Sequence, residues 1–374
     1  MKEHSLSVLI IDGESEFALF VARCLAQVPD LDLHVLSNDP WSPLRFSRHR
    51  RTYRYQAREH NHEQWLDAIR QAAARTSADI ILPVDEPATH FVSVHRQSVA
   101  EIAALPPIPE LAAFDTVVDK WLLAQLLSES GIPGPATILC TADDEFERNL
   151  RDFQFPVLIK PTRARGGEGI QRFDTPSDLL GALSDIAATS SYQYVVQTFI
   201  HGYNVDCSVL CDDGKILAYT IQRGFVGGSQ SFAASAGIDF IHHDQVFDVI
   251  GKLVSATRFS GIAHVDLRYD RQEEQAKIID INARYWGSLI GSLVVGVNFP
   301  HLACLAALGV DFSAPDYQLG RYMAPGVAAK QGLRKLLGRS ELEFTFEQTG
   351  LPYALGDPIA EVAKLIKQAL SEHR

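Results

Sequence analysis

The sequence predicts an α/β region followed by an α+β region, and three observations support this fold class. Strand-like and helix-like segments alternate over residues 8–84, which is the pattern of a doubly wound parallel sheet. Beyond residue 155, short apolar runs are separated by turns rich in glycine and aspartate, as in antiparallel sheets. The chain has 374 residues, a length that suits two or three packed units rather than one small module.

Composition indicates a folded protein and argues against several classes of partner. Hydrophobic residues make up 46% of the chain and charged residues 21%, so a large core can form and general disorder is excluded. The net charge of −12 disfavours nucleic acid and anionic membranes as partners. No run approaches the roughly 18 apolar residues of a membrane span, and the polar start of the chain has no signal-peptide pattern. Five scattered cysteines without a C-x-x-C pair fit a reducing cytoplasm.

The α/β region opens with a strand, a helix and a second strand. Residues 8–11 read as a buried parallel strand, and residues 31–35 alternate as the next one. A helix is expected over residues 63–75 and a third strand over residues 79–84. The arginines and tyrosines of residues 45–55 predict a solvated or salt-bridged loop rather than a nucleic-acid patch.

The α+β region reads as antiparallel strands with one helix between them. A turn at residues 212–214 joins the last two of the first five strands, a helix follows over residues 244–258, and a hairpin spans residues 261–282. The tail after about residue 308 is expected to be helical in parts. The apolar runs that predict the first five strands are residues 157–160, 170–173, 194–197, 205–210 and 215–222.

The hairpin carries the first candidate site residues. Opposed residues in an antiparallel pair have numbers that sum to a constant, so a turn centred near Glu273 places Asp266 opposite Asp280 and His264 opposite Asn282. Successive side chains point to opposite faces of a strand. The residues that this alternation sends to the other, buried face are Val265, Leu267, Ile279 and Ile281.

Two facing aspartates destabilise a hairpin unless a cation lies between them. Mg²⁺ is commonly bound by one or two carboxylates together with nucleotide phosphates, so a divalent metal site at Asp266 and Asp280 is the functional interpretation. An exposed hairpin face whose acids pair with Arg268 and Arg284 is the structural alternative, and at this point it has equal weight. His264 is expected to be a hydrogen-bonded histidine rather than a metal ligand.

A glycine-rich loop forms the second candidate site. Lys160 ends an apolar strand, and Gly166, Gly167 and Gly169 follow in the next turn. Glycines allow backbone N–H groups to approach an anion closely, which suits a polyphosphate. The spacing is neither that of a P-loop nor G-x-G-x-x-G. Taken alone, such a loop is more often only a turn.

The order of these features resembles the ATP-grasp superfamily, specifically the branch similar to the large subunit of carbamoyl phosphate synthetase. The motifs follow one another between Asp119 and Pro300 in the family's order. The segments that carry the resemblance are Asp119-Lys120, residues 131–137, residues 155–161 with 166–169, residues 196–202, and residues 280–288 continuing into 296–300. The division of the chain that the resemblance implies is an N-terminal Rossmann-like domain over 1–112, a first ATP-grasp subdomain with the glycine loop over 113–198, a second with the metal-binding hairpin over 199–310, and a C-terminal extension over 311–374.

The resemblance implies an ATP molecule clamped between two subdomains, with Mg²⁺ or Mn²⁺ as its metal. Arg284 and Lys160 would be catalytic, and Arg284 would face the transferred phosphoryl group. The residues implied for the nucleotide are Lys120, Lys160, Gly166, Gly167, Gly169, Gln197, Thr198, Phe199, Ile200 and Asn204. The residues implied for the metal are Asp266, Asp280 and Asn282.

Some positions depart from the family's pattern. Thr198 and Asn204 stand where the family usually has acidic residues, although Asp206 follows two positions after Asn204. Asp280 stands where glutamate is commoner, which keeps the charge on a shorter side chain, and Ala283 replaces the usual proline. These departures leave ribose binding and the metal geometry open.

The resemblance implies an ATP-dependent, ADP-forming ligase that joins a small-molecule carboxylate to an amine or thiol through an acylphosphate, with a possible homodimer as its assembly. The alternatives are a kinase-like or carboxylase-like enzyme of the same fold and a nucleotide-binding protein without catalysis. A dinucleotide-dependent dehydrogenase is disfavoured, because residues 12–15 supply only one glycine after the first strand.

Two further residues are candidate substrate contacts. Glu86 follows a predicted parallel strand, at the sheet edge where such folds bind ligands, and is a candidate contact for the amine. A capped turn before Pro87 is an equal alternative. Arg223 precedes a glycine-rich stretch and is a candidate partner for the substrate carboxylate, with a surface loop as the alternative of equal weight.

Overall fold

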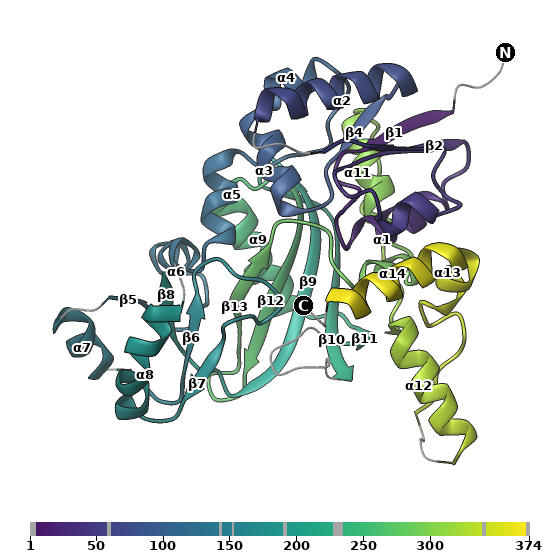
Figure 1. Ribbon diagram of the computed structural model, residues 1–374. Helices are drawn as coiled ribbons and strands as arrows, with labels where there is room; N and C mark the ends of the chain where they lie inside the picture. The colour runs from purple at the N-terminus through teal and green to yellow at the C-terminus, as the bar shows by residue number, and fades with distance from the viewer. Residues whose placement is uncertain are drawn as a thin grey trace.

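Three β-sheets organise the chain in the computed structural model (Figure 1). The first is parallel and the other two are antiparallel. This confirms the predicted fold class of an α/β region followed by an α+β region. The residues that the structure describes are 5–57, 61–141, 144–151, 153–189, 193–226, 235–338 and 342–371.

The N-terminal sheet has four parallel strands in the order β3-β2-β1-β4. Its apolar strand residues pack against helices on both sides, which makes it doubly wound. The bounds of its strands are β1 (Leu6–Ile10), β2 (Leu31–Ser37), β3 (Thr52–Tyr55) and β4 (Ile80–Leu82). The bounds of the first helices are α1 (Ala18–Leu25), η1 (Pro43–Phe46), α2 (His62–Thr76), α3 (Glu86–Val94) and α4 (Arg96–Ala100).

The edge strand β3 corrects the prediction of a loop over residues 45–55. Residues 52–55 pair with β2 in parallel register. Threonine and tyrosine favour strands, while the arginine among them can stay hydrated at a sheet edge. Without a second buried face, this short segment lacks the apolar run by which the other strands were predicted.

The largest sheet has six antiparallel strands in the order β13-β12-β9-β10-β11-β14. Helix α9 (Asp244–Thr257) covers one face, together with α5 (Leu111–Val118) and α6 (Lys120–Glu129). Its strands β9, β10, β12 and β13 were predicted, whereas β11 and β14 were not. The strand bounds are β9 (Gly202–Asp212), β10 (Lys215–Val226), β11 (Gly237–Phe240), β12 (Gly261–Asp270), β13 (Gln275–Asn282) and β14 (Gly320–Met323).

The third sheet has four strands in the order β5-β8-β6-β7. Helices α7 (Asp144–Arg151) and α8 (Pro176–Thr189) contribute Phe146, Leu150 and Leu179 to the apolar core on one of its faces. In Figure 1 this unit lies beside the long strands of the largest sheet. The strand bounds are β5 (Thr137–Cys140), β6 (Val157–Pro161), β7 (Gln171–Phe173) and β8 (Tyr194–Thr198).

The segment after β13 returns to the N-terminal sheet. Tyr285 donates a backbone hydrogen bond to Val84 at 3.1 Å, and Trp286 is buried in the core that it shares with β1, β4 and α1. The end of β13 therefore meets the end of β4. The helices that follow are α10 (Leu289–Val294), α11 (Phe299–Ala307), α12 (Pro325–Leu336), α13 (Leu351–Gly356) and α14 (Pro358–Ser371).

The C-terminal stretch is helical, as predicted, and is attached to the N-terminal sheet. Arg23, which is 1% exposed, pairs with Glu361 of α14 at 2.7 Å. Strand β14 also joins the largest sheet through β11. The division of the chain at residues 112, 198 and 310 stays a prediction. No helix within the described residues has both the length and the apolar character needed to cross a bilayer.

Candidate active site

The hairpin of β12 and β13 has the register that the sequence predicts at its polar end. Asp266 pairs with Asp280, and His264 pairs with Asn282. Residues opposed across a pair of strands point to the same face. The two aspartates, the histidine and the asparagine therefore share one face of the largest sheet.

The prediction of the buried face is wrong at one position. The register shifts between Asp266 and Leu267, so that Leu267 faces Ile278 and not Ile279. Ile278 is 1% exposed and lies in the core, whereas Ile279 is only partly buried. A β-bulge inserts one residue into one strand, and the alternation of residue types does not reveal where it occurs.

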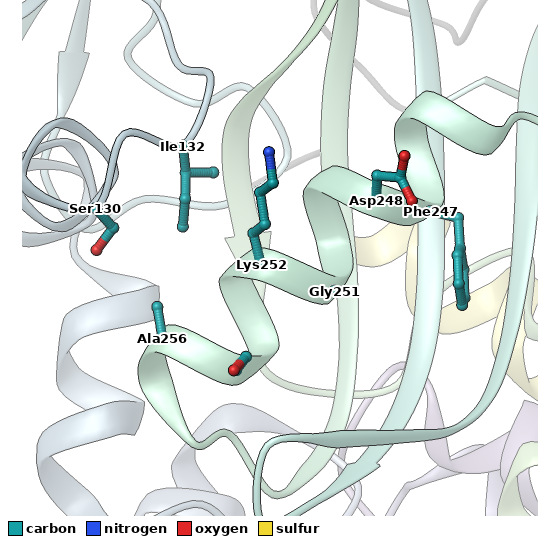
Figure 2. Close-up of a pocket in the computed structure, with 8 residues that line it drawn as sticks. Ser130, Ile132, Phe247, Asp248, Gly251, Lys252 and Ala256 are labelled. Atoms are coloured by element: carbon teal, nitrogen blue, oxygen red, sulfur yellow. The ribbon is translucent and has the colours of Figure 1, made fainter.

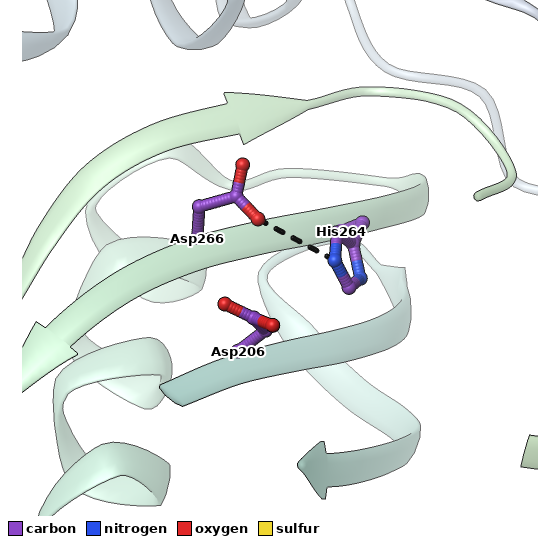
Figure 3. A group of neighbouring side chains, drawn as sticks. All are labelled: Asp206, His264 and Asp266. Carbon is purple, nitrogen blue, oxygen red and sulfur yellow. Dashed lines mark ion pairs between the residues drawn. The ribbon is translucent and has the colours of Figure 1, made fainter. Parts of the chain in front are cut away.

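A third aspartate joins the two of the hairpin. Asp206 on β9 pairs with Asp266 on β12, so three neighbouring strands present Asp206, Asp266 and Asp280 in one row. Figure 3 shows Asp206 beside Asp266 and His264. The sequence analysis missed this role for Asp206 and noted it only as a neighbour of Asn204. A register count across β9 and β12 finds it, but only once these two strands are known to pair.

The row of acids carries shifted pKa values. Burial, reinforced by the charge of Asp280, raises the pKa of Asp266 to about 7. Burial and the nearby Asp266 raise the pKa of Asp206 well above its ordinary value. Burial lowers the pKa of His264 to about 3, with Arg284 adding to the effect. Like charges held together without a counter-ion produce such shifts, so the row is a strong candidate for a cation site.

Lysine side chains reach this face from two other elements. Asp119 caps α6 by accepting hydrogen bonds from the backbone of Trp121 and Leu122 at 3.0 and 3.2 Å. This cap places Lys120 at the start of the helix, where its Nζ lies 3.1 Å from Asp280 Oδ2. The same Nζ donates to the carbonyl of Ala164 in the glycine loop at 3.3 Å.

Lys160 lies at the end of β6 and is 4% exposed. Its Nζ donates to Gln197 Oε1 at 2.7 Å, and Gln197 Nε2 donates to Thr137 Oγ1 at 3.2 Å. Burial lowers the pKa of Lys160 to about 8, partly offset by the charge of Asp280. The ammonium group is therefore held near the acidic row without a direct carboxylate partner, as a group that binds phosphate needs to be.

Arg284 connects the hairpin to its own neighbours. It donates through Nη2 to Asn282 Oδ1 at 2.8 Å and through Nη1 to the carbonyl of Tyr285 at 2.9 Å. Asn282 Nδ2 in turn donates to Asp266 Oδ2 at 3.2 Å. Arg268, the other arginine considered for this face, donates to backbone carbonyls near residue 200 and to Asn204 instead.

The structure brings Glu86 to Arg284, as the sequence analysis considered. Glu86 Oε1 lies 3.7 Å from Arg284 Nε, and Glu86 Oε2 lies 3.1 Å from Arg165 of the glycine loop. Burial raises the pKa of Glu86, opposed by these two arginines. Asp85 accepts a hydrogen bond from the backbone of Glu86 at 2.8 Å, so the capped turn is present as well. Arg165 was missed, because nothing in the sequence shows which residue of the loop faces the N-terminal sheet.

Arg223 is not brought to the other candidates. It is exposed on β10 and pairs with Val205 of β9, so it shares the face opposite to that of Asp206. Its guanidinium group lies 5.8 Å from the ring centre of Tyr203. The residues that follow, 227–234, lie outside the described part of the chain.

The linker after β8 is held in place by backbone hydrogen bonds. Thr198 and Phe199 donate to carbonyls of residues 136 and 156, both at 3.0 Å. The carbonyl of Ile200 accepts from Arg268 Nε at 2.6 Å, and Asn204 Oδ1 accepts from Arg268 Nη1 at 2.5 Å. The linker is thereby fixed beside the polar face.

A cavity of about 560 Å³ lies where the third sheet meets β13 and α6. Lys120 and Gln197 line it, and both are candidate nucleotide contacts. A second cavity, of about 610 Å³, lies against the outer side of α9, as Figure 2 shows. Its lining includes Phe247 and Lys252 but no residue predicted for the site. The chemistry-bearing groups therefore gather at the first cavity and along the acidic row.

The glycine loop has the backbone that only glycine adopts easily. Gly166, Gly167 and Gly169 have φ values of 61°, 84° and 71°, in the left-handed region. A Cβ at Gly169 would lie 2.8 Å from Pro161 Cγ. These residues allow the loop to fold tightly over the end of β6.

We expect Gly169→Ala to weaken ATP binding while leaving the melting temperature close to that of the wild type. The added methyl group is strained at this φ and displaces the loop from Pro161. Calorimetric titration with ATP checks this result. Gly181→Ala is the matched control, because a Cβ there meets nothing within 4 Å and the residue lies in α8. Equal ATP affinity in Gly169→Ala and the wild type would contradict a role for the loop.

The facing sheets, the buried lysines, the glycine loop and the acidic hairpin define a class of ATP-binding folds. Residues 117–288 match the family model described as the ATP-grasp domain, so the chain carries an ATP-grasp domain. The resemblance seen in the sequence is thereby confirmed, and the family is one of ligases and carboxylase-like enzymes.

Comparisons with individual proteins agree with this assignment. The chain is 24% identical over 214 residues to the mitochondrial, arginine-specific large chain of carbamoyl phosphate synthase from Neurospora crassa, covering 54% of this chain but only 18% of that protein. Among solved structures, N5-carboxyaminoimidazole synthetase from Staphylococcus aureus has a TM-score of 0.69 at 13% identity, covering 92% of this chain and 89% of the other. An L-amino acid ligase from Bacillus licheniformis has a TM-score of 0.60 at 18% identity, covering 82% and 75%. At these identities the solved structures support the fold alone.

Proposed function

We propose that this protein is an ATP-dependent ligase that activates a carboxylate as an acylphosphate and joins it to an amine, with release of ADP and phosphate. One observation carries the proposal. A continuous line of contacts runs from Asp266 through Asn282 and Arg284 to Glu86. It joins acidic oxygen ligands, a buried cation and a carboxylate of the N-terminal sheet within one site.

The donor set of the hairpin fits a hard divalent cation. Asp266, Asp280 and Asn282 offer carboxylate and amide oxygens on one face, which are the ligands that Mg²⁺ and Mn²⁺ accept. The raised pKa of Asp266 reflects a repulsion that such a cation would relieve. When bound there, the metal would neutralise phosphate charge and help to orient the terminal phosphoryl group.

The chain's own cations would hold the nucleotide phosphates. Lys120 and Lys160 approach the acidic row from α6 and β6, and the glycine loop lies beside Lys120. Phosphoryl transfer depends mainly on positioning and on neutralising charge. These groups supply both without forming a covalent bond to the substrate.

Arg284 and Glu86 would act on the two organic substrates. Arg284 is placed to stabilise charge on the phosphoryl group as the carboxylate attacks it, because a guanidinium group binds such oxygens in a fixed geometry. Glu86, whose pKa is raised by burial, is placed to contact the amine and to accept its proton when the amine attacks the acylphosphate. Phosphate then leaves, and the amide bond remains.

The test of this proposal is a screen for substrate-dependent release of ADP in the presence of Mg²⁺. The panel contains amino acids and small carboxylates, offered singly and in pairs. A ligase is expected to release ADP only when a suitable carboxylate is present, and faster when an amine accompanies it. ADP release that is equally fast without any carboxylate would contradict the proposal.

We expect the affinity for ATP to fall as the pH rises above about 8. Lys160 is protonated below its pKa of about 8 and loses the charge that binds phosphate above it, by up to about tenfold in affinity per pH unit. In Lys160→Arg this part of the pH dependence should disappear, because arginine keeps its charge. Lys160→Ala should bind ATP weakly at every pH. Calorimetric titrations between pH 6.5 and pH 9.5 measure these affinities, and the same slope in all three proteins would exclude Lys160 from the phosphate site.

The five cysteines are free thiols, and burial raises the pKa of those at positions 24, 207, 211 and 304. Thiols of this kind are structural rather than reactive. We therefore place the enzyme in a reducing cytoplasm.

A further inference from the structure

Beside the site of the nucleotide, a second group of side chains is arranged to bind a cation. Asp206, His264 and Asp266 each offer one ligand atom, and these atoms lie within 4.8 Å of one another. Figure 3 shows the imidazole and the two carboxylates converging from the neighbouring strands β9 and β12. Asp206 and His264 have no part in the ligase chemistry proposed above.

The imidazole of His264 is held as a metal ligand would be. Its Nδ1 lies 2.9 Å from Ser208 Oγ, and its Nε2 lies 3.4 Å from Asp266 Oδ1. With the proton on Nδ1 and donated to the hydroxyl, the lone pair of Nε2 points towards the carboxylates. Metal-binding histidines are commonly fixed by such a bond from the other nitrogen. The ring of Trp286 stacks on the imidazole at 5.5 Å and 17° and holds its orientation.

An unsatisfied amide oxygen lies on the same face. Gln222 pairs with Asp206 in the register of β9 and β10, so the two side chains leave the sheet side by side. Gln222 is 1% exposed, and its Nε2 donates to Ser288 Oγ at 3.3 Å. Its Oε1 is buried and has no hydrogen-bond partner within the described part of the chain. A buried oxygen in this state is costly unless a cation or a donor meets it.

We propose that Asp206, His264 and Asp266, together with Gln222 Oε1, bind a divalent transition-metal ion that does not require the nucleotide. An imidazole nitrogen added to carboxylate oxygens favours Mn²⁺ and the later transition metals over Mg²⁺. Asp266 is shared with the metal site of the hairpin, so the ion lies at the other end of the same acidic row. It neutralises Asp206, which the nucleotide's own metal does not reach.

Titration of the nucleotide-free full chain with Mn²⁺, followed by electron paramagnetic resonance, tests the site. The wild type is expected to remove the signal of free Mn²⁺ in proportion to its concentration. Asp206→Asn and His264→Gln should weaken Mn²⁺ binding at least about tenfold, and Ser208→Ala, which loosens the imidazole, about 10- to 100-fold. Asp213→Asn is the matched control, because Asp213 is an exposed acid at the turn between β9 and β10 and should retain the wild-type affinity.

A second measurement needs no variant. Mn²⁺ bound to the wild type should show spin-echo modulation from a directly bonded imidazole nitrogen, and this modulation should be lost in His264→Gln. Bound Mn²⁺ without nitrogen modulation in the wild type would overturn the site, as would a wild type that leaves the free signal undiminished or an Asp206→Asn variant that binds normally.

The site and the proposed function fail separately. Asp280→Asn should keep nucleotide-free Mn²⁺ binding, because Asp280 is outside the group, while losing ADP release. Normal Mn²⁺ binding with no ligase activity on any substrate would count against the proposed function alone. Ligase activity with no nucleotide-free Mn²⁺ binding would count against this site alone.

Discussion

Replacing Asp280 with asparagine, or Asn282 with alanine, is expected to reduce ATP turnover by about a hundredfold or more and to leave the fold intact. Asp280 ends the acidic row and pairs with Lys120 at 3.1 Å, while Asn282 holds Asp266 on one side and Arg284 on the other. Both lie on the polar face of the hairpin. Each change therefore removes a proposed metal ligand without creating a cavity in the core.

The measurement is Mg²⁺-dependent ADP release, with a melting curve for each variant. Asp280→Asn also removes one of two facing carboxylates, so its melting temperature should not fall much below that of the wild type. Asp213→Asn makes the same chemical change at an exposed turn and should turn over ATP normally. If both site variants released ADP at the wild-type rate, the metal assignment would be wrong.

Hydroxylamine is expected to trap an acylphosphate as a hydroxamate when ATP and the correct carboxylate are present and the amine is absent. This nucleophile attacks activated carbonyl carbons and leaves phosphate esters intact, so trapping separates a ligase from a kinase. Arg284→Met should abolish trapping, because the guanidinium group that neutralises the moving phosphoryl charge is removed. ATP binding should survive in this variant, since Lys120, Lys160 and the glycine loop remain.

Two assays on the same samples decide between the outcomes. Hydroxamate is measured colorimetrically, and ATP affinity is measured by titration. Arg284 also contacts Glu86 and stacks 4.3 Å from the ring centre of Phe17, so a melting curve is needed to exclude general unfolding. A stable phosphorylated product without hydroxamate, from a substrate that supports ADP release, would favour the kinase.

Elements with strong local patterns could be predicted from the sequence. The strands β1, β2 and β4 are apolar runs that need no partner to be recognised. The hairpin of β12 and β13 could be predicted to the residue near its aspartates, because a short turn fixes the sum of the paired numbers. The strands β3, β5, β11 and β14 have four residues each, too few to show a period.

The sequence by itself determined the family, the acidic hairpin with Asp266 opposite Asp280, and the lysine and glycine loop of β6, because each depends on residues that are close in the chain. Only the tertiary structure decided that Asp206 joins the aspartate row and that Arg165 and Arg284 meet Glu86. It also decided that Arg223 lies on the opposite face. These contacts join distant strands and loops, and their geometry depends on how whole sheets pair and pack, which alternation within one strand does not encode.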